Sequence, residues 1–277
     1  MVGTGGRSLR KPQRVAVVGL GAIGLRVVEA LNAGVPGCEL AAIVVRDRTR
    51  AESKLRHLDK PFPFFTLRDA EPRADIVVEC APAAMLPEIV EPFLRAGKTA
   101  IVLSVSAILS NYHLVDIARD HGGQIAAPTG ALLGLDAVTA AAEGEVHSVR
   151  MITRKPVLGL AGAPYLVERN ISLVGIAAPL CVFRGTARQA AVGFPANLNV
   201  AAALSLAGIG PDRTSLEIWA DPSLDRNVHS IEVDSDSARF SMTIDNIPTD
   251  NPRTARISAL SVISYLRKLA APLRVGS

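Results

Sequence analysis

Hydrophobic and polar positions follow two different patterns along the chain, and the change comes near residue 130. Between residues 14 and 128, short and mainly apolar runs alternate with segments of helical periodicity; the runs are residues 15–18, 39–45, 74–81, 99–106 and 124–127. Continuous apolar runs of this length are typical of strands buried on both faces of a parallel sheet. Their alternation with helices predicts an α/β domain with a doubly wound, Rossmann-type parallel sheet.

Strand-like runs follow one another more closely after residue 130. They are residues 145–153, 179–184, 214–220, 228–233 and 238–244, with helical segments at 136–142 and 197–207. Because few helices separate these runs, they predict a second, α+β domain with a mainly antiparallel sheet. Residues 252–269 predict a long helix with an apolar stripe, which we expect to pack back on the first domain. The predicted division is a disordered lead-in over 1–13, a first domain over 14–130 completed by the helix 252–270, and a second domain over 131–250.

A glycine motif follows the first apolar run. Gly19, Gly21 and Gly24 have the spacing G-x-G-x-x-G, and Ala22 and Ile23 lie where a helix is predicted to begin. A strand, a glycine turn and a helix in this order are typical of a dinucleotide site, with the pyrophosphate at the helix N-terminus. The structural alternative is a glycine-rich turn that binds nothing. We expect residues 14–130 to be a dinucleotide-binding domain.

The ends of the next apolar runs supply further candidates for cofactor binding. Asp47, after the second run, lies where an acidic residue binds the adenosine ribose, but the neighbouring Arg46 suits a 2′-phosphate instead. The choice between NAD and NADP therefore stays open, and Asp47 could also be a loop carboxylate paired with an arginine. Cys80, Ala81 and Ser104 lie at the ends of the third and fourth runs, where we expect the nicotinamide ring.

Composition narrows the class of protein. Of the 277 residues 49% are hydrophobic, which allows a sizeable core. The three cysteines are far apart in the sequence and favour buried free thiols in a reducing cytoplasm, and we see no Cys/His cluster with metal-ligand spacing. The formal net charge of +4 is spread along the chain, so nucleic-acid binding has little support. No apolar run is long enough for a membrane span.

Catalytic candidates come from the second half of the chain. His229 follows a polar turn and can exchange protons near neutral pH, although a lone histidine is more often structural. Arg154 and Lys155, in T-R-K-P, could hold the carboxylates of an acidic substrate or form a solvated strand end. Asn197 and Asn199 lie at the start of a helix. Asn197 fits an N-cap and is a further candidate for binding the substrate, and Asn199 could turn toward a carboxamide or a substrate.

Taken together, these stretches resemble the L-aspartate dehydrogenase family. The matching segments run from the glycine motif almost to the end of the chain: G-L-G-A-I-G, T-G-A-L-L-G-L-D (residues 129–136), T-R-K-P, the stretch 185–208 around F-P-A-N-L-N-V, A-D-P-S-L-D-R-N-V-H (220–229) and I-P-T-D-N-P-R-T-A (247–255). Two departures are the threonine that opens the second segment in place of serine, and V-L-G after T-R-K-P where a second proline is frequent.

The resemblance implies an activity and roles for individual residues. The activity is the reversible, NAD- or NADP-dependent oxidative deamination of L-aspartate, through iminosuccinate, to oxaloacetate and ammonia, which supplies nicotinamide nucleotide synthesis or degrades aspartate. His229 would donate and accept protons, while Ala131 and Asn199 would contact the cofactor, with Asn197 as the alternative to Asn199. The second domain would also carry the contact of a homodimer, and the enzyme would be cytoplasmic.

Two other functions remain open on the sequence alone. The first is an NAD(P)-dependent reductase of another imine or keto acid, because the fold serves many substrates. The second is a non-catalytic dinucleotide-binding protein, against which the presence of His229 argues.

Overall fold

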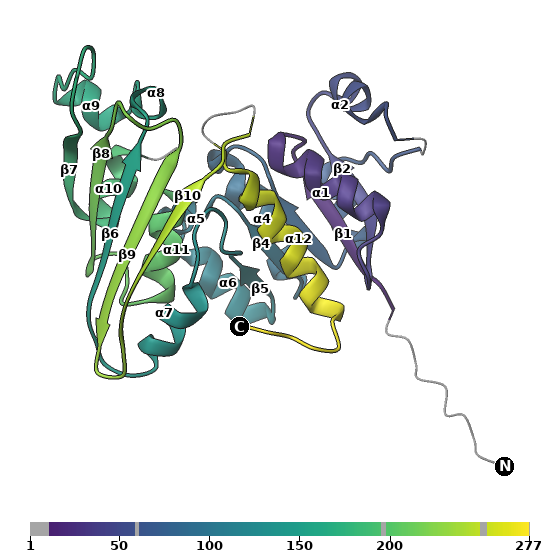
Figure 1. Cartoon of the computed structure of the whole chain (residues 1–277). Helices are drawn as coiled ribbons and strands as arrows, with labels where there is room; N and C mark the ends of the chain where they lie inside the picture. The colour runs from purple at the N-terminus through teal and green to yellow at the C-terminus, as the bar shows by residue number, and fades with distance from the viewer. Residues whose placement is uncertain (1–10, 59–60, 195–197, 250–253, 277) are drawn as a thin grey trace.

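The computed structural model describes residues 11–58, 61–194, 198–249 and 254–276. Within these residues the chain forms two five-stranded sheets that stand side by side, with α12 (Arg256–Ala270) on the first (Figure 1). The predicted pairing of a doubly wound domain with an α+β domain is confirmed. Residues 1–10 of the expected lead-in lie outside the described residues, and Gln13 already belongs to the first strand.

The first sheet is parallel throughout and has the strand order β2-β1-β3-β4-β5. Its strands are β1 (Gln13–Val18), β2 (Cys38–Val44), β3 (Ile76–Glu79), β4 (Thr99–Val102) and β5 (Gln124–Ala126). Successive side chains of β1 point to opposite faces of the sheet. Val15 and Val17 pack with α1 (Ala22–Ala33), whereas Ala16 and Val18 pack with α4 (Leu86–Arg95). A strand buried on both faces has no polar side, which explains the continuous apolar run.

Some boundaries differ from the predicted ones. The strand expected over residues 99–106 ends at Val102, and α5 (Val105–Ser110) begins three residues later. Helix α6 (His113–His121) follows α5. The short helix α2 (Arg48–Leu55) was not predicted, although the Asp47 carboxylate caps it. The helix α10 (Ala187–Gly193) was also missed, although Thr186 and Gln189 form a capping box at its start. Two single-turn helices, α3 (Leu67–Ala70) and η1 (Glu71–Arg73), precede β3.

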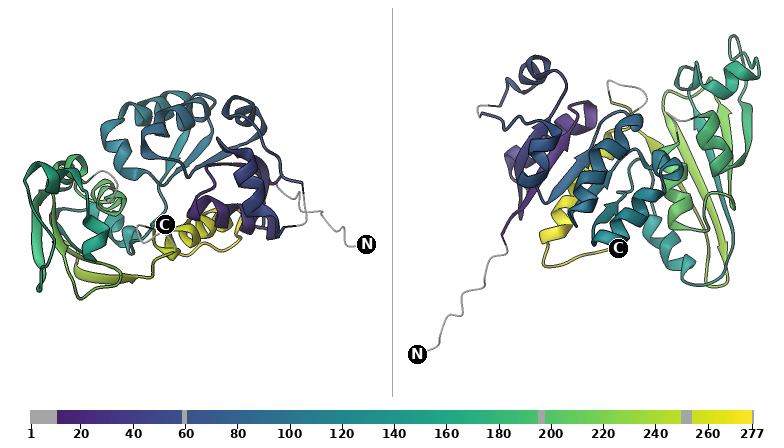
Figure 2. Two further views of the ribbon diagram at one scale, coloured as in Figure 1. Left: turned by 90° about the horizontal axis from the view of Figure 1, so that it is seen from above. Right: turned by 180° about the vertical axis from the view of Figure 1, so that it is seen from behind.

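The second sheet has the order β10-β9-β6-β8-β7. Its strands are β6 (Val146–Lys155), β7 (Leu180–Thr186), β8 (Thr214–Ala220), β9 (Asn227–Ser235) and β10 (Arg239–Asn246). Strands β6 and β8 pair in parallel, whereas the other pairings are antiparallel, so the sheet is mixed but mainly antiparallel as predicted. One face packs on α7 (Leu135–Ala142), α10 and α11 (Asn199–Ala207) (Figures 1 and 2). The short helices α8 (Val157–Leu160) and α9 (Pro164–Glu168) follow β6.

The last helix, α12, crosses back to the first domain and lies beside α1 (Figure 1). Val262 and Leu266 are fully buried there and share a hydrophobic cluster with Val27, Val28 and Leu31 of α1. The Cys38 thiol also donates to the carbonyl oxygen of Leu266. The apolar stripe of α12 therefore completes the cover on one face of the parallel sheet.

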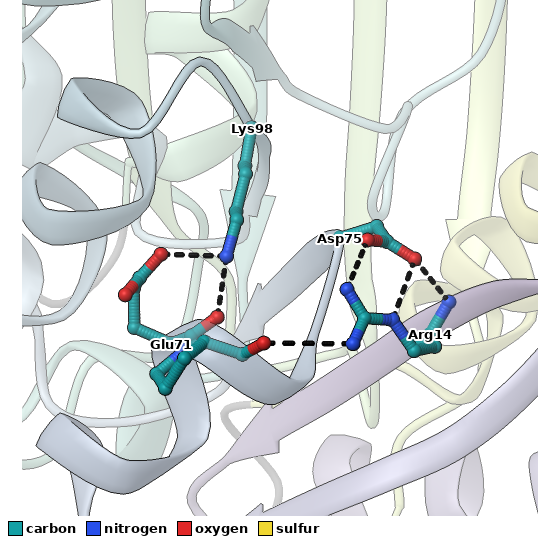
Figure 3. Close-up of polar contacts among 5 residues, drawn as sticks. Arg14, Glu71, Asp75 and Lys98 are labelled. Carbon is teal, nitrogen blue, oxygen red and sulfur yellow. Dashed lines mark hydrogen bonds and ion pairs between the residues drawn. The ribbon is translucent and has the colours of Figure 1, made fainter.

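Two ion pairs stabilise the amino-terminal edge of the first sheet (Figure 3). The Asp75 carboxylate accepts hydrogen bonds from the backbone N–H of Arg14 (3.0 Å) and from its guanidinium (2.6 Å), which lowers the pKa of Asp75. The Lys98 ammonium donates to the carboxylate and the carbonyl oxygen of Glu71. Because ligands of such sheets bind at the opposite, carboxyl edge, these pairs are structural.

A buried carboxylate joins the carboxyl ends of β3 and β4. Glu79 is fully buried and accepts four hydrogen bonds: from the backbone N–H of Ala81 (3.2 Å), Leu103 (3.2 Å) and Ser104 (2.9 Å), and from the Ser104 hydroxyl (3.0 Å). Burial raises the pKa of Glu79, while these hydrogen bonds act in the opposite direction. Three of the four donors are peptide N–H groups, which can donate to a carboxylate but cannot accept a hydrogen bond from a protonated carboxyl group.

This arrangement predicts a large effect of Glu79→Ala on stability. The substitution leaves three peptide N–H groups without an acceptor, that of Ser104 buried and those of Ala81 and Leu103 partly buried, so we expect the free energy of unfolding to fall by about 3 kcal/mol. Glu79→Gln is the matched control, because its carbonyl oxygen can still accept from Leu103 and Ser104. Urea denaturation should rank the proteins as wild type, Gln variant and Ala variant; equal midpoints for all three would contradict the role of Glu79 in joining the strands.

Candidate active site

A cavity of about 1400 Å³ lies between the carboxyl edge of the first sheet and the second domain. The first domain lines it with the β1–α1 turn, the ends of β2, β3 and β4, and residues 128–131. The second domain contributes Lys155, Asn199, Asn227 and His229. The cavity is therefore the place where residues separated by more than half of the chain can act on one ligand.

The glycine motif has the shape of a phosphate cradle. Gly19 has φ of +92°, and a Cβ there would lie 2.5 Å from the carbonyl oxygen of Cys80; a Cβ on Gly24 would lie 2.0 Å from the carbonyl oxygen of Gly19. Both positions require glycine for packing. Gly21 differs, because a Cβ there would meet nothing within 4 Å. Packing of the protein does not explain this glycine, whereas close approach of a ligand to the backbone does.

The start of α1 is open to an anion. Gly21 caps the helix without a side chain, the first turn carries no acidic residue, and Ala22 and Ile23 line the cavity. The N–H groups of the first turn have no partner within the helix and carry the positive end of its dipole. The cradle therefore fits the pyrophosphate of a dinucleotide.

The end of β2 combines a carboxylate with cations. Asp47 lines the cavity, and its Oδ1 accepts a hydrogen bond from the backbone N–H of Arg50 (2.9 Å). Arg46 and Arg48 line the same region; Arg48 also pairs with Glu52 at 2.7 Å. One carboxylate oxygen and at least one guanidinium thus remain available in the wall, which suits a ribose hydroxyl or a 2′-phosphate.

The predicted residues at the ends of β3 and β4 are brought together in the cavity wall. Cys80, Ala81 and Ser104 all line it, next to the Glu79 carboxylate that holds both loops. Burial raises the pKa of the Cys80 thiol, so this group stays protonated and is no nucleophile.

Asn199 connects the two domains at the cavity. It is the first residue of α11, and its Oδ1 accepts from the backbone N–H (3.1 Å) and the hydroxyl (2.8 Å) of Ser106 in α5. The carbonyl oxygen of the side chain is thereby occupied, which leaves the amide nitrogen as the group for a ligand. Ala131 lines the cavity nearby, and Asn246 donates to its carbonyl oxygen (2.9 Å). Asn197 lies outside the described residues.

The second sheet places two basic side chains in the cavity wall. Lys155 ends β6, and His229 lies on β9, where its register partner is Thr153. Lys155 is 4% exposed and His229 2% exposed. Burial lowers the pKa of Lys155 to about 8, and burial together with the charge of Lys155 lowers the pKa of His229 to about 3. Near neutral pH the imidazole is therefore neutral and the lysine charged.

Arg154 lies away from the cavity. Side chains alternate along a strand, so Thr153 and Lys155 face the core while Arg154 projects from the other face of the sheet. There its guanidinium lies 3.6 Å from the Asp221 carboxylate and stacks over the Trp219 ring at 5.1 Å. Of the two cations in T-R-K-P, only Lys155 reaches the cavity.

Two residues of this region were missed by the sequence analysis. Glu79 interrupts an otherwise apolar strand, I-V-V-E, and that interruption was a signal. Thr153 lies two positions before Lys155 and so shares its face of β6, which strand alternation already implied. Its hydroxyl lies 2.8 Å from Nδ1 of His229.

Neither a metal site nor a membrane span is found among the described residues. No group of three His, Cys, Asp or Glu side chains in that part of the chain is arranged to hold a metal ion. None of the helices described there is both long and apolar enough to cross a bilayer.

Two known families match this chain, and each match covers one of the two sheets. Residues 136–269 match the family described as aspartate dehydrogenase, C-terminal, and residues 19–128 match the homoserine dehydrogenase NAD-binding domain. The chain is 56% identical over 264 residues to the L-aspartate dehydrogenase of Bradyrhizobium diazoefficiens, covering 95% of this chain and 94% of the relative. It is also 56% identical to L-aspartate dehydrogenase 3 of Bordetella bronchiseptica, covering 98% and 100%.

More distant proteins share the fold. The L-aspartate dehydrogenase of Methanosarcina mazei is 36% identical over 269 residues, covering 95% of this chain and 99% of the relative. The crystal structure of an aspartate dehydrogenase from Thermotoga maritima superimposes with a TM-score of 0.75 at 24% identity, over 95% of this chain and 99% of that one. These likenesses extend over both domains and the cavity between them: the chain belongs to the L-aspartate dehydrogenase family.

Proposed function

We propose that the protein catalyses the reversible oxidative deamination of L-aspartate with NAD or NADP, through iminosuccinate, to oxaloacetate and ammonia. The observation that carries the proposal is the pair formed by His229 and Lys155 in the wall of the cofactor cavity. A buried ammonium group suits a dicarboxylate, and a neutral imidazole beside it can take up a proton. The high identity to L-aspartate dehydrogenases over nearly the whole chain supports the same reaction.

The residues of the cavity fit the cofactor. Gly21 and the open start of α1 would hold the pyrophosphate, and Asp47 or Arg46 the adenosine ribose with or without its 2′-phosphate. Ala81, Ser104, Ala131 and Asn199 would surround the nicotinamide end. The bound cofactor supplies the hydride acceptor; the protein supplies binding, orientation and proton transfer.

The two basic residues have separate roles in this proposal. Lys155 binds a carboxylate of aspartate and orients its Cα–H toward the cofactor. His229 accepts a proton from the water molecule that attacks the imine, and returns it to the nitrogen that leaves as ammonia. The cavity wall described here contains Lys155 but not Arg154, so we assign the substrate contact to Lys155.

We further propose a cytoplasmic homodimer. The face of the second sheet that is turned away from its helices carries a network of charges, in which Arg150 pairs with Glu217 (2.9 Å) and Glu232 (3.3 Å). Complementary charges on a sheet face suit an isologous contact with a second copy.

The proposed reaction is tested by the oxidation of reduced cofactor. Purified protein is mixed with oxaloacetate, ammonium and either NADH or NADPH, and the absorbance of the reduced nicotinamide is followed. We expect rapid oxidation that stops when ammonium is left out. Oxidation without ammonium would indicate a keto-acid reductase, and cofactor binding without oxidation a non-catalytic protein. In His229→Ala we expect turnover to fall by about 10²- to 10⁴-fold, with binding of NADH retained.

Alanine substitutions at Gly21 and Gly24 of the glycine motif should have different effects, the first on cofactor binding and the second on stability. Gly21→Ala adds a methyl group in open space, so the protein should fold as the wild type does, while its Kd for NADH rises about tenfold or more because the methyl group meets the pyrophosphate. Gly24→Ala places the methyl group against the carbonyl oxygen of Gly19 and should lower the melting temperature. Fluorescence titration and thermal denaturation of both variants separate these effects. Wild-type affinity in Gly21→Ala would contradict the cradle.

The lowered pKa of Lys155 predicts how the binding of dicarboxylates depends on pH. Below about pH 8 the ammonium is charged and holds a carboxylate; above it the charge is lost, while His229 stays neutral throughout. The inhibition constant of succinate, a dicarboxylate without an amino group, should therefore rise above that pH by up to about tenfold per pH unit. In Lys155→Arg the rise should disappear, because arginine keeps its charge. A constant value in the wild type up to about pH 10 would exclude Lys155 as the carboxylate-binding group.

A further inference from the structure

Thr153 and His229 form a buried polar pair behind the cavity wall. They are directly opposite on β6 and β9, with 0% and 2% of their surface exposed, and the Thr153 Oγ1 lies 2.8 Å from Nδ1 of His229. His229 borders the cavity, but Thr153 does not. The Nδ1 edge of the ring is therefore turned into the sheet and held there, and Nε2 is the nitrogen that is left for the cavity.

We propose that Thr153 is a positioning residue for His229: its hydroxyl accepts a hydrogen bond from Nδ1–H and so presents the Nε2 lone pair to the substrate. This inference rests on the proposed function, in which His229 moves the protons. In the neutral ring one nitrogen carries the proton and the other accepts, so a partner that accepts from Nδ1 leaves Nε2 as the base. No other described residue makes a hydrogen bond to this ring.

The same contact suits both stages of the proton transfer. When water attacks the carbon of the protonated imine, the new C–O bond forms, the π-electron pair of the C=N bond moves to nitrogen, and a water proton passes to Nε2 of His229. That proton is then given to the amino nitrogen, and the C–N bond breaks with its electron pair leaving on ammonia. An oxygen lone pair of the remaining hydroxyl forms the C=O bond of the keto acid, and the hydroxyl proton passes to Nε2, which releases it to solvent. Nδ1 keeps its hydrogen throughout, so the Thr153 oxygen remains an acceptor in both states, and the ring keeps its direction.

A hydroxyl that binds Nδ1 of His229 has a different effect on the proton affinity of the ring than a carboxylate would have. A carboxylate at Nδ1 would fix the tautomer and also stabilise the imidazolium strongly, so the ring would retain its proton. The Thr153 hydroxyl is uncharged and directs the ring without adding a negative charge beside it. This suits a histidine that must release its proton in each turnover, within a patch that already contains the charged Lys155.

The test separates the hydroxyl of Thr153 from its methyl group. Thr153→Val keeps the shape and removes the hydroxyl, whereas Thr153→Ser keeps the hydroxyl. We expect kcat for aspartate to fall about 10- to 100-fold in the Val variant, with KM for aspartate and Kd for NADH nearly unchanged, and to be largely restored in the Ser variant. A Val variant with wild-type kcat would overturn the proposal, as would equal losses in Val and Ser. If Thr153→Val does not fold, the pair Thr153→Ala and Thr153→Ser repeats the comparison without the methyl group.

A second readout needs no substrate. In protein labelled with ¹⁵N-histidine, the side-chain signals of His229, assigned by their loss in His229→Asn, report which ring nitrogen carries the proton. We expect the Nδ1–H form in the wild type and in Thr153→Ser, and a shift toward the Nε2–H form in Thr153→Val. An Nε2–H ring in the wild type would overturn the proposal even if the enzyme is active. A wild type without aspartate activity, but with the Nδ1–H ring, would instead refute the proposed function alone.

Discussion

Two basic side chains, Lys155 and His229, share one buried patch of the second sheet, where charging both of them at once is costly. Lys155 and His229 are almost fully buried, so a charge on either side chain is poorly hydrated. The positive charge of Lys155 also disfavours a positive charge on the His229 imidazole. In the proposed reaction a carboxylate of the substrate would offset this cost, because its negative charge lies beside the Lys155 ammonium. The low pKa of His229 keeps the imidazole neutral, so that one of its ring nitrogens is free to accept a proton.

The positions of these groups are set by strand pairing and by hydrogen bonds between elements. The β6–β9 register places His229 opposite Thr153, and strand alternation brings Lys155 to the same face. In the first domain Glu79 holds the loop that contains Ser104, and two residues later Ser106 binds Asn199 of the second domain. A continuous set of polar contacts thus runs from the end of β3 to the start of α11. Any shift of the second domain would disturb the loops after β3 and β4 that line the cavity.

Much of this organisation could be predicted from the sequence, because the signals are local. Continuous apolar runs and the glycine spacing indicated the parallel sheet and the cradle, and the apolar stripe of the last helix indicated where it packs. Helix α2 was missed because its polar sequence has little apolar periodicity. The strand expected to reach Ser106 was too long because the β-branched Val105 favours a strand, although it begins α5. Arg154 was grouped with Lys155 as a neighbour in sequence, whereas the alternation of a strand separates them.

The functional contacts that sequence analysis could not find are those between distant segments. Thr153 and His229 are 76 positions apart, and Ser106 and Asn199 are 93 apart, so no local pattern joins them. The sequence suggested Asn199 as an amide for the cofactor, but only the contact with Ser106 shows which atom of the amide is occupied. Fold and ligand class follow from periodicity and spacing. Which atom of a side chain is left for a ligand, Nε2 of His229 or Nδ2 of Asn199, follows from the neighbour that binds the other atom.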